Sequence, residues 1–201
     1  MKEEWDYMEN RWKQYQNETT NPNKIKFIKS VLETSEQNDG IAIDLGCGAG
    51  NDSIYMIQNG WKVIAIDSEV SVIEERRKEL TIQQQNRLQI INKKFEEVQL
   101  SEADLILANY SIPFCNPKEF EKLWNKIQKS LKPSGIFAGV LFGINDGWSQ
   151  RKNMTFKTKE EIGKMLKNFK IELIEEKEFD RPTAMSKEKH WHIFKIIARK
   201  I

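Results

Sequence analysis

The sequence predicts an α/β protein with a doubly wound, mostly parallel β-sheet and helices on both faces. Apolar, strand-like runs alternate with amphipathic, helix-like stretches along the chain, a pattern typical of consecutive βαβ units. Residues 41–67 also read as strand, glycine turn, helix, glycine stop, strand and acid, within the roughly 30 residues that one βαβ unit needs. The chain has 201 residues, so we expect residues 1–201 to form a single domain.

The first 38 residues are expected to form a helical extension ahead of the sheet. Trp5, Met8, Trp12 and Tyr15 share one face of a first helix, by their spacing along the chain. A second helix is expected after Asn21-Pro22, because proline is favoured in the first turn of a helix. Two interpretations are open for the first helix, which either packs on the domain or acts as an aromatic lid over a ligand cleft.

The glycine turn between the first two strands indicates a nucleotide site. An apolar run ends at Asp44 and is followed by Gly46, Gly48 and Gly50, and the next apolar run ends at Asp67. Glycine permits positive φ and lets a ligand approach the backbone closely. An acid at the end of the second strand, about 20 positions after the first glycine, can accept hydrogen bonds from a ribose diol. Asp67 has this position, 21 residues after Gly46.

The glycine spacing favours S-adenosylmethionine (SAM) over a dinucleotide. The dinucleotide fingerprint requires Gly or Ala at position 51, where this chain has Asn51. Asp44 lies two residues before the turn, and a negative group there disfavours a pyrophosphate and suits a cationic amine. SAM carries an ammonium and a sulfonium and no phosphate. An NAD-dependent oxidoreductase is therefore the weaker reading of the same unit.

The remaining elements follow from periodicity and turn residues. The expected helices are residues 69–80, a stripe from Phe120 to Leu131, and a helix that Thr158 caps with Glu161 in a capping box. A polar stretch, 81–86, and loops at 143–154 and 181–188 separate these elements. The further strands are expected at 88–91, 103–108, 136–142, 171–176 and 192–199.

The glycine turn resembles motif I of the class I SAM-dependent methyltransferases, whose pattern D/E-x-G-x-G-x-G appears as Asp44-Leu-Gly46-Cys-Gly48-Ala-Gly50. The later segments SLKPSGIFAGVLFG, Asp146-Gly-Trp148, MTF and KHWHIF resemble bacterial methyltransferases related to tellurite-resistance methyltransferases. The resemblance implies a Rossmann-like, seven-stranded sheet with an antiparallel last strand. It implies a ligand site beyond the carboxyl ends of strands one, four and five, and it favours the lid interpretation of the first helix.

The resemblance also implies cofactor contacts for particular residues. Phe95 and Glu96 occupy the position where the family commonly holds the adenine. Asn109 stands at motif IV, where amino-group DNA methyltransferases often have N-P-P-Y; this chain keeps the Asn and lacks the paired prolines. The residues expected to bind SAM, or its product S-adenosylhomocysteine (SAH), are Asp44, Gly46, Cys47, Gly48, Gly50, Asp67, Ser68, Phe95, Glu96 and Asn109.

The reaction leaves a weak catalytic signature in the sequence. Methyl transfer from a sulfonium is an in-line displacement, for which a protein mainly positions the reactants and excludes water. Asn109 and Tyr110 follow the fourth strand, and His190 lies at the start of the last strand. These three residues are the candidates on the acceptor side, with His190 as a possible base near neutral pH. His, Cys and Asp show no metal-ligand spacing, and no metal is expected.

For the methyltransferase that the resemblance implies, the near-neutral charge favours a small-molecule acceptor, and we expect the protein to be cytoplasmic. The chain has 32 basic and 30 acidic residues and a net charge of +2, without the basic block typical of nucleic-acid binding. No apolar stretch is long enough to span a membrane, and the charged N-terminus does not resemble a signal peptide. Two alternatives stay open: a nucleic-acid or protein methyltransferase, and a SAM-binding protein without turnover. A basic face including Lys152, Lys157 and Lys187 would favour the former. The oligomeric state is left open.

Overall fold

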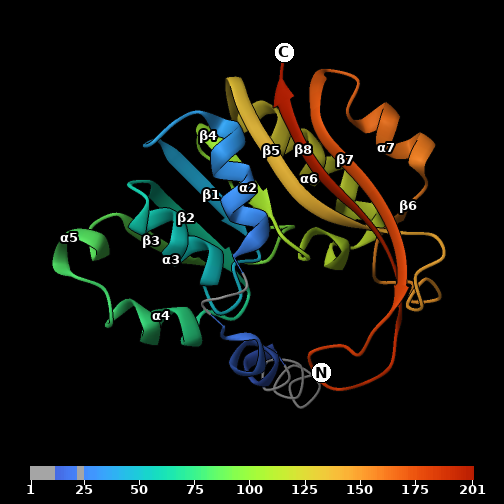
Figure 1. Ribbon diagram of the computed structural model, residues 1–201, viewed down its shortest axis with the longest axis horizontal. Helices are drawn as coiled ribbons and strands as arrows, with labels where there is room; N and C mark the ends of the chain where they lie inside the picture. The colour runs from blue at the N-terminus through green and yellow to red at the C-terminus, as the bar shows by residue number, and fades with distance from the viewer. Residues whose placement is uncertain (1–11, 22–24) are drawn as a thin grey trace.

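A single mixed β-sheet forms the centre of the computed structural model, which describes residues 12–21 and 25–201 (Figure 1). The strand order is β3-β2-β1-β4-β5-β8-β7, and a short β6 pairs with β5. The pairs among β1 to β6 are parallel, whereas β8 runs antiparallel to both β5 and β7. The Rossmann-like sheet with an antiparallel last strand is therefore confirmed.

Eight strands make up this sheet. They are β1 (Ile41–Leu45), β2 (Lys62–Asp67), β3 (Leu88–Asn92), β4 (Ala103–Ala108), β5 (Leu131–Gly143), β6 (Phe156–Lys157), β7 (Phe169–Asp180) and β8 (His190–Lys200). The two-residue β6 is the strand that the sequence pattern missed. No element was predicted between the loop at 143–154 and the helix capped by Thr158, because two residues carry no periodicity.

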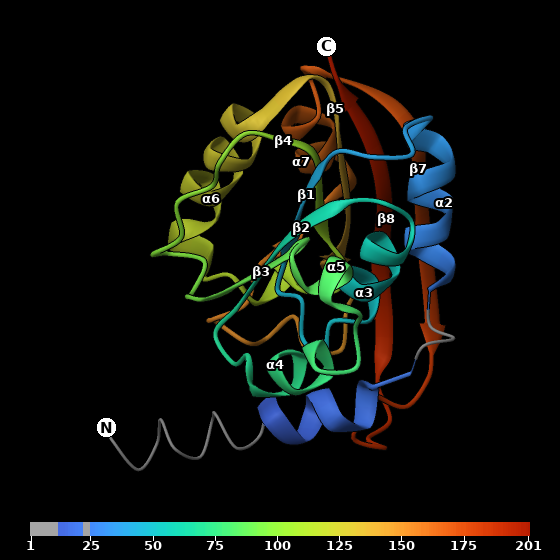
Figure 2. The same cartoon turned by 90° about the vertical axis from the view of Figure 1, so that its left-hand side faces the viewer.

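Helices cover both faces of the sheet (Figures 1 and 2). The helices are α2 (Lys26–Ser35), α3 (Asn51–Gln58), α4 (Ser71–Arg77), α5 (Ile82–Gln85), α6 (Pro117–Ser130) and α7 (Lys159–Met165), with a 3-10 turn η1 (Ile112–Phe114). Residues 12–19 are also helical. The predicted helix-face residues Trp5 and Met8 lie outside the described residues.

Two apolar clusters fill the space between sheet and helices. One joins α2 and α3 to the sheet, and includes Ala42 of β1. The other joins α6 and α7 to the opposite face, and includes Ile43, the next residue of β1. Neighbouring strand residues point to opposite faces, so a strand that is apolar at every position is buried on both sides. This explains why ADLILA, residues 103–108, is a continuous apolar run.

The structure differs from the expected elements mainly at loops and ends. The polar stretch 81–86 contains the short helix α5, which a capping box between Thr81 and Gln84 stabilises. Strands β7 and β8 are longer than expected, because they pair with each other from Phe169 to Asp180. The predicted capping box of α7, between Thr158 and Glu161, is present.

The strand order places a ligand site at one edge of the sheet. From β1 the chain moves outward to β2 and β3 on one side, and then to β4 and β5 on the other. The carboxyl ends of β1 and β4 therefore diverge into loops on opposite faces, which leaves a crevice between them. No helix among the described residues is long and apolar enough to cross a membrane.

Candidate functional site

The glycine turn after β1 folds back on the end of β2. The backbone N–H of Gly46 donates to the carbonyl of Ile66 over 2.7 Å, and the N–H of Gly48 donates to Oδ2 of Asp67 over 2.9 Å. Gly46 has φ of +73°, and a Cβ there would lie 2.3 Å from Cβ of Ser111. Only glycine fits this position, because both the conformation and the space exclude a side chain.

Three acidic side chains surround this turn. The Asp44 side chain is buried, and its carboxylate accepts a hydrogen bond from the Ser53 hydroxyl over 2.6 Å. Burial, reinforced by the charge of Asp52, raises the pKa of Asp44 to about 8. Burial also raises the pKa of Asp52 to about 6 and raises that of Asp67. A carboxylate is stabilised by a nearby positive charge, so the site is suited to a cationic ligand.

Several polar atoms that face the same region have no partner among the described residues. The Asn109 amide donates to Oδ2 of Asp52 over 2.8 Å. The other oxygens of this pair, Oδ1 of Asp52 and Oδ1 of Asn109, are buried and accept no hydrogen bond from residues 12–21 or 25–201, and the same holds for Oε1 of Gln16. Buried acceptors are nearly always satisfied in folded proteins. Three orphaned acceptors at one place therefore indicate that a ligand with hydrogen-bond donors belongs there.

A cavity of about 1430 Å³ opens over the glycine turn. Most residues predicted to contact the cofactor line it, as does the acceptor-side candidate Tyr110. The lining includes Asp44, Gly46, Cys47, Gly48, Asp67, Ser68, Phe95, Glu96, Asn109 and Tyr110. Gly50 is absent from this lining; it is the N-cap of α3, where its φ of +76° and the close Ile73 side chain require glycine.

His190, the third acceptor-side candidate, lies away from the cavity. Its ring contacts the carboxylates of Asp180 and Glu178 on β7, over 2.8 and 3.2 Å. His192 is buried and accepts from the Asn145 backbone N–H at Nδ1, while its Nε2 faces Glu176. Both rings thus pair with acids of the neighbouring strand. Within residues 12–21 and 25–201, no group of three or more His, Cys, Asp and Glu residues is arranged to hold a metal ion.

The helical segment 12–19 covers part of the cavity, next to α4 at the lower end of the view in Figure 2. The Gln16 amide donates to the carbonyl of Glu69 over 2.9 Å, and the Asn51 amide donates to the carbonyl of Thr19 over 2.9 Å. The Trp12 ring meets Phe114 edge-on at 5.0 Å between centroids. Through these contacts the segment is attached to the glycine turn and to the loop after β4.

Aromatic rings form the wall of the cavity opposite the acids. Tyr110, at the end of β4, has φ of +56°, an uncommon conformation for a residue with a side chain. Its ring meets Trp191 of β8 edge-on at 6.0 Å. The Trp191 indole N–H donates to the carbonyl of Arg181 over 2.8 Å. Phe114, Phe179 and Arg181 also line this side of the cavity.

A buried ion pair supports this aromatic wall from behind. The Lys189 ammonium lies 2.7 Å from Oδ2 of Asp146, and both side chains are almost fully buried. The same ammonium lies 3.4 Å from the ring centroid of Trp191 and 4.2 Å from that of Trp148. Desolvation lowers the pKa of Lys189, and the hydrogen bond to Asp146 opposes that shift. Cation–π contacts of this kind fix ring orientation as well as contributing stability.

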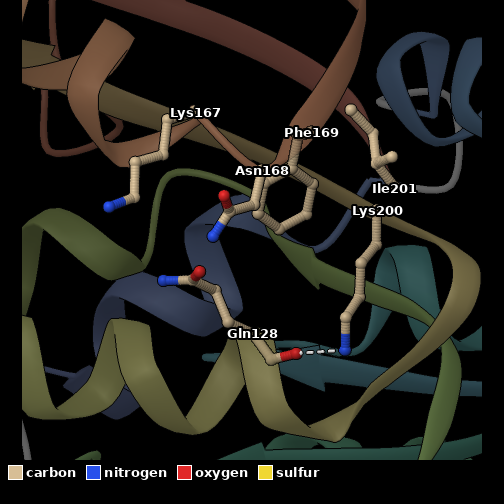
Figure 3. A pocket seen from close by; sticks show the side chains of 6 residues that line it. All are labelled: Gln128, Lys167, Asn168, Phe169, Lys200 and Ile201. Carbon is tan, nitrogen blue, oxygen red and sulfur yellow. Dashed lines mark hydrogen bonds between the residues drawn. The ribbon is translucent and has the colours of Figure 1, made fainter.

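A second, smaller hollow of about 450 Å³ lies at the opposite edge of the sheet (Figure 3). Its lining includes Lys167, Asn168 and Lys200. The Lys200 ammonium donates to the backbone carbonyl of Gln128 over 2.7 Å, so this charge connects the end of β8 to α6. None of the predicted site residues lies here.

Sequence reasoning missed several cavity residues. Asp52 lies two residues after Gly50, and Ser111 lies directly after Tyr110. The acid in the first turn of α3 was a signal that could have been used. Gln16, Arg181 and Trp191 reach the cavity only because distant segments meet there, so no local spacing identifies them. The basic residues Lys152, Lys157 and Lys187 do not line the cavity.

Comparison with known proteins shows what this arrangement is similar to. A family model described as a methyltransferase domain matches residues 42–135, which include the glycine turn, Asp67 and Asn109. The carboxy-S-adenosyl-L-methionine synthase of Erwinia tasmaniensis is 28% identical over 130 residues, or 62% of this chain and 53% of that protein. The corresponding synthase of Yersinia enterocolitica is 26% identical over 118 residues, or 56% and 44%. The chain thus spans about half the length of these curated relatives.

Solved structures share the fold. TehB from Haemophilus influenzae superimposes with a TM-score of 0.72 at 15% identity, over 86% of this chain and 62% of that one. The Burkholderia thailandensis 1,6-didemethyltoxoflavin-N1-methyltransferase, solved with 1,6-didemethyltoxoflavin and SAH, gives 0.66 at 21% identity, over 88% and 77%. The sheet order and the glycine turn agree with the family match, so residues 42–135 are similar to a methyltransferase domain and the sheet has the fold of these solved structures.

Proposed function

We propose that this protein is a SAM-dependent methyltransferase that methylates a small molecule by in-line transfer. One observation supports the proposal most strongly. Beside the glycine turn, at the carboxyl ends of β1 and β4, acidic side chains lie together with buried oxygen atoms that have no hydrogen-bond partner among the described residues. In this proposal, residues 1–201 work as one domain in which the N-terminal helical extension covers the cofactor.

The residues around the turn fit SAM by their chemistry. Asp67 offers carboxylate oxygens at the end of β2, where a ribose diol can donate to them. Asp44, Asp52 and Asn109 provide negative and accepting atoms for an ammonium, which would satisfy the orphaned oxygens. Phe95 and Glu96 line the cavity on the β3 side, where we assign the adenine. The bare backbone at Gly46, Cys47 and Gly48 admits the amino-acid part.

The chain's own contribution to transfer is positioning. Bound SAM supplies a methyl group on a sulfonium; the acceptor lone pair forms the new bond to that carbon while the carbon–sulfur electron pair goes to sulfur, giving SAH. Asn109 and Tyr110 would hold the acceptor in line at the end of β4, and segment 12–19 would exclude water. An acceptor that arrives deprotonated needs no base, and a protonated one releases its proton to solvent water after the new bond to carbon has formed.

Two observations favour a small acceptor over a macromolecule. The first concerns the cavity that the helical segment 12–19 and the β7–β8 loop border. The lysines that would form a basic face, Lys152, Lys157 and Lys187, lie outside its lining. The Burkholderia thailandensis neighbour holds 1,6-didemethyltoxoflavin, a small molecule. The names of the curated relatives add carboxy-SAM synthesis as a second candidate for the same cofactor site.

Mass spectrometry after incubation with SAM and fractionated cell metabolites tests the proposal. We expect SAH to appear together with one metabolite that gains a methyl group, and both to be lost in Asp67→Ala. A matched control is Asp180→Asn, which removes a carboxylate that pairs with His190 away from the cavity. A carboxylated derivative of SAM would support the second candidate instead. Binding of SAM without SAH formation in any fraction would contradict the enzymatic proposal and favour a non-catalytic SAM-binding protein.

A further inference from the structure

The acceptor half of the cavity is walled by aromatic rings from four separate segments. Trp12 contacts Tyr15 at 5.8 Å and Phe114 at 5.0 Å between centroids, both edge-on. Tyr110 and Trp191 meet at 6.0 Å, again edge-on. All five rings line the cavity. Aromatic walls in this number are suited to a planar apolar ligand, which gains offset or edge-on ring contacts in place of water.

Three hydrogen-bond donors on this side have no partner among the described residues. The Tyr15 and Tyr110 hydroxyl groups and the Arg181 guanidinium all belong to residues that line the cavity. Within the described part of the chain none of the three side chains forms a hydrogen bond or an ion pair. The indole N–H of Trp191 donates to the backbone carbonyl of Arg181, so the backbone of this residue is fixed beside the aromatic wall, and its side chain is exposed where it lines the cavity.

Tyr110 lies near enough to Tyr15 and to Arg181 for both to affect its pKa. Desolvation raises the pKa of Tyr110, the Tyr15 hydroxyl raises it further, and the Arg181 charge opposes both. The acid on this side that also acts on Tyr110 is Glu175, and it is already paired with Lys177 at 2.7 Å and Lys195 at 3.5 Å. The positive charge of Arg181 is therefore not neutralised by a carboxylate of the described chain.

The two ends of the cavity thus have opposite character. The end at the glycine turn holds Asp44, Asp52 and Asp67, whereas the end at the β7–β8 loop offers a guanidinium and two hydroxyl donors. Arginine binds carboxylates through two parallel N–H···O bonds, and tyrosine hydroxyls add single donors. A ligand held here would present an anionic group to Arg181 and its remaining planar surface to the rings.

We propose that the methyl acceptor is a planar aromatic carboxylate, whose carboxyl group binds Tyr15, Tyr110 and Arg181. This inference rests on the proposed methyltransferase function, because it assigns the substrate class of the same cavity. In this arrangement the carboxylate of the acceptor lies beside Arg181, and the aromatic ring of the acceptor points toward the end of β4. Arg181 is then a residue that determines specificity, and Tyr15 links acceptor binding to the N-terminal helical segment.

Calorimetric titration of SAH-saturated protein tests this substrate class. The probes are benzoate, 2-naphthoate and indole-3-carboxylate, each paired with its neutral carboxamide. We expect at least one carboxylate to bind about tenfold or more tightly than its carboxamide, because the ion pair with Arg181 is charge-assisted. Arg181→Gln should remove this preference, and Arg181→Lys should retain part of it, because lysine keeps the charge without the planar fork.

A control variant and a separate readout keep the result interpretable. Arg151 lies over the Trp148 ring at 4.3 Å and does not line the cavity, so Arg151→Gln removes the same charge and should leave the preference unchanged. SAH binding is measured first in every variant. If SAH binds and no carboxylate is preferred over its carboxamide, the substrate class is wrong and the proposed function stands. If SAH does not bind the unmodified protein, the proposed function fails and the inference fails with it.

Discussion

Asp44 and Asp52 are buried carboxyl groups that lie near each other. No cationic side chain of the described residues forms an ion pair with either of them. Burial is the main reason that their pKa values rise to about 8 and about 6, respectively. Two negative charges in a poorly solvated site repel each other, so one or both carry a proton near neutral pH. A ligand with an ammonium and a sulfonium would stabilise the deprotonated carboxylates, so that these protons are released on binding.

SAM binding should therefore strengthen as the pH rises from about 5.5 to about 8.5. Over this range Asp52 and then Asp44 lose their protons in the free protein, and the cationic ligand no longer has to displace them. Titrations in two buffers of different ionisation enthalpy should show proton release on binding at pH 7. Asp52→Asn should reduce both the release and the lower part of the pH dependence. Affinity that is flat from pH 5.5 to 8.5 would contradict this account.

The same raised pKa values determine the pH dependence of stability. Such a carboxyl group has a higher pKa in the folded state than in the unfolded state, where the pKa is about 4. The folded state therefore becomes less stable as the pH rises from the unfolded-state pKa to the folded-state pKa. The ligand-free protein should accordingly unfold at a lower temperature at pH 8.5 than at pH 6, and SAM should raise the unfolding temperature more at the higher pH. Thermal scans of the ligand-free and SAM-bound protein at both pH values measure this difference.

At the residue scale, local spacing was sufficient for some side chains and insufficient for others. Asp44, Gly46 and Asp67 were predicted because the turn constrains them within one βαβ unit. Arg181 and Trp191 could not be predicted from local spacing, because their place in the cavity depends on the pairing of β7 with β8. His190 was proposed from its chemistry alone, and its position beside Asp180 and Glu178 follows from that same strand pairing.

The helical segment 12–19 contributes no residue to the two main apolar clusters. Trp12 touches Tyr15 and Phe114, which line the cavity, and it belongs to neither main cluster. Trp12→Ala should therefore weaken SAH binding by about tenfold, since burial of a large aromatic ring contributes a few kcal/mol at most. The unfolding temperature of the ligand-free protein should change little.

Calorimetry with SAH and a thermal scan of the same variant separate binding from folding. Trp12→Phe, which keeps an aromatic ring, should recover most of the affinity. If Trp12→Ala binds SAH as tightly as the unmodified protein, segment 12–19 does not act as a cover for the cofactor. A large fall in unfolding temperature would instead support the interpretation of a simple packing helix.

The start of β8 depends on the buried pair of Lys189 and Asp146. Replacing one partner leaves the other charge buried without compensation, which costs about 3–5 kcal/mol. Lys189→Met should lower the free energy of unfolding in urea by this amount. Lys159→Met is the matched control, since Lys159 is exposed and pairs with Glu176 on the surface; its effect should stay below about 1 kcal/mol. A similar, small loss in both variants would contradict a structural role for the buried pair.

The elements that could be predicted are those with strong periodicity or definite caps. Residues 103–108 form β4 with the expected bounds, and Thr158 caps α7 as expected. The short helix α5 was missed because its four residues, Ile82–Gln85, contain three glutamines and no apolar stripe. The full length of β7 was missed because its outer half is polar, and pairing with β8 rather than burial holds it extended.

For the whole molecule, the strand order determines where the chemistry can occur. The order 3-2-1-4 opens a crevice at the carboxyl ends of β1 and β4, and the acids, the orphaned acceptors and the cavity are all found there. The sequence could predict this edge because motif I and the alternation of elements define a doubly wound sheet. It could not predict the shape of the acceptor half, which segments from both ends of the chain build together.

Calorimetric titration of the purified protein with SAM, SAH and NAD in parallel tests the central claim most directly. We predict that SAM and SAH bind with micromolar dissociation constants, that NAD does not bind, and that Asp67→Ala weakens SAH binding by about 10-fold to 100-fold through loss of charge-assisted hydrogen bonds. Asp180→Asn should leave both affinities unchanged. Binding of NAD alone, or of none of the three, would contradict the assignment of this cavity to SAM.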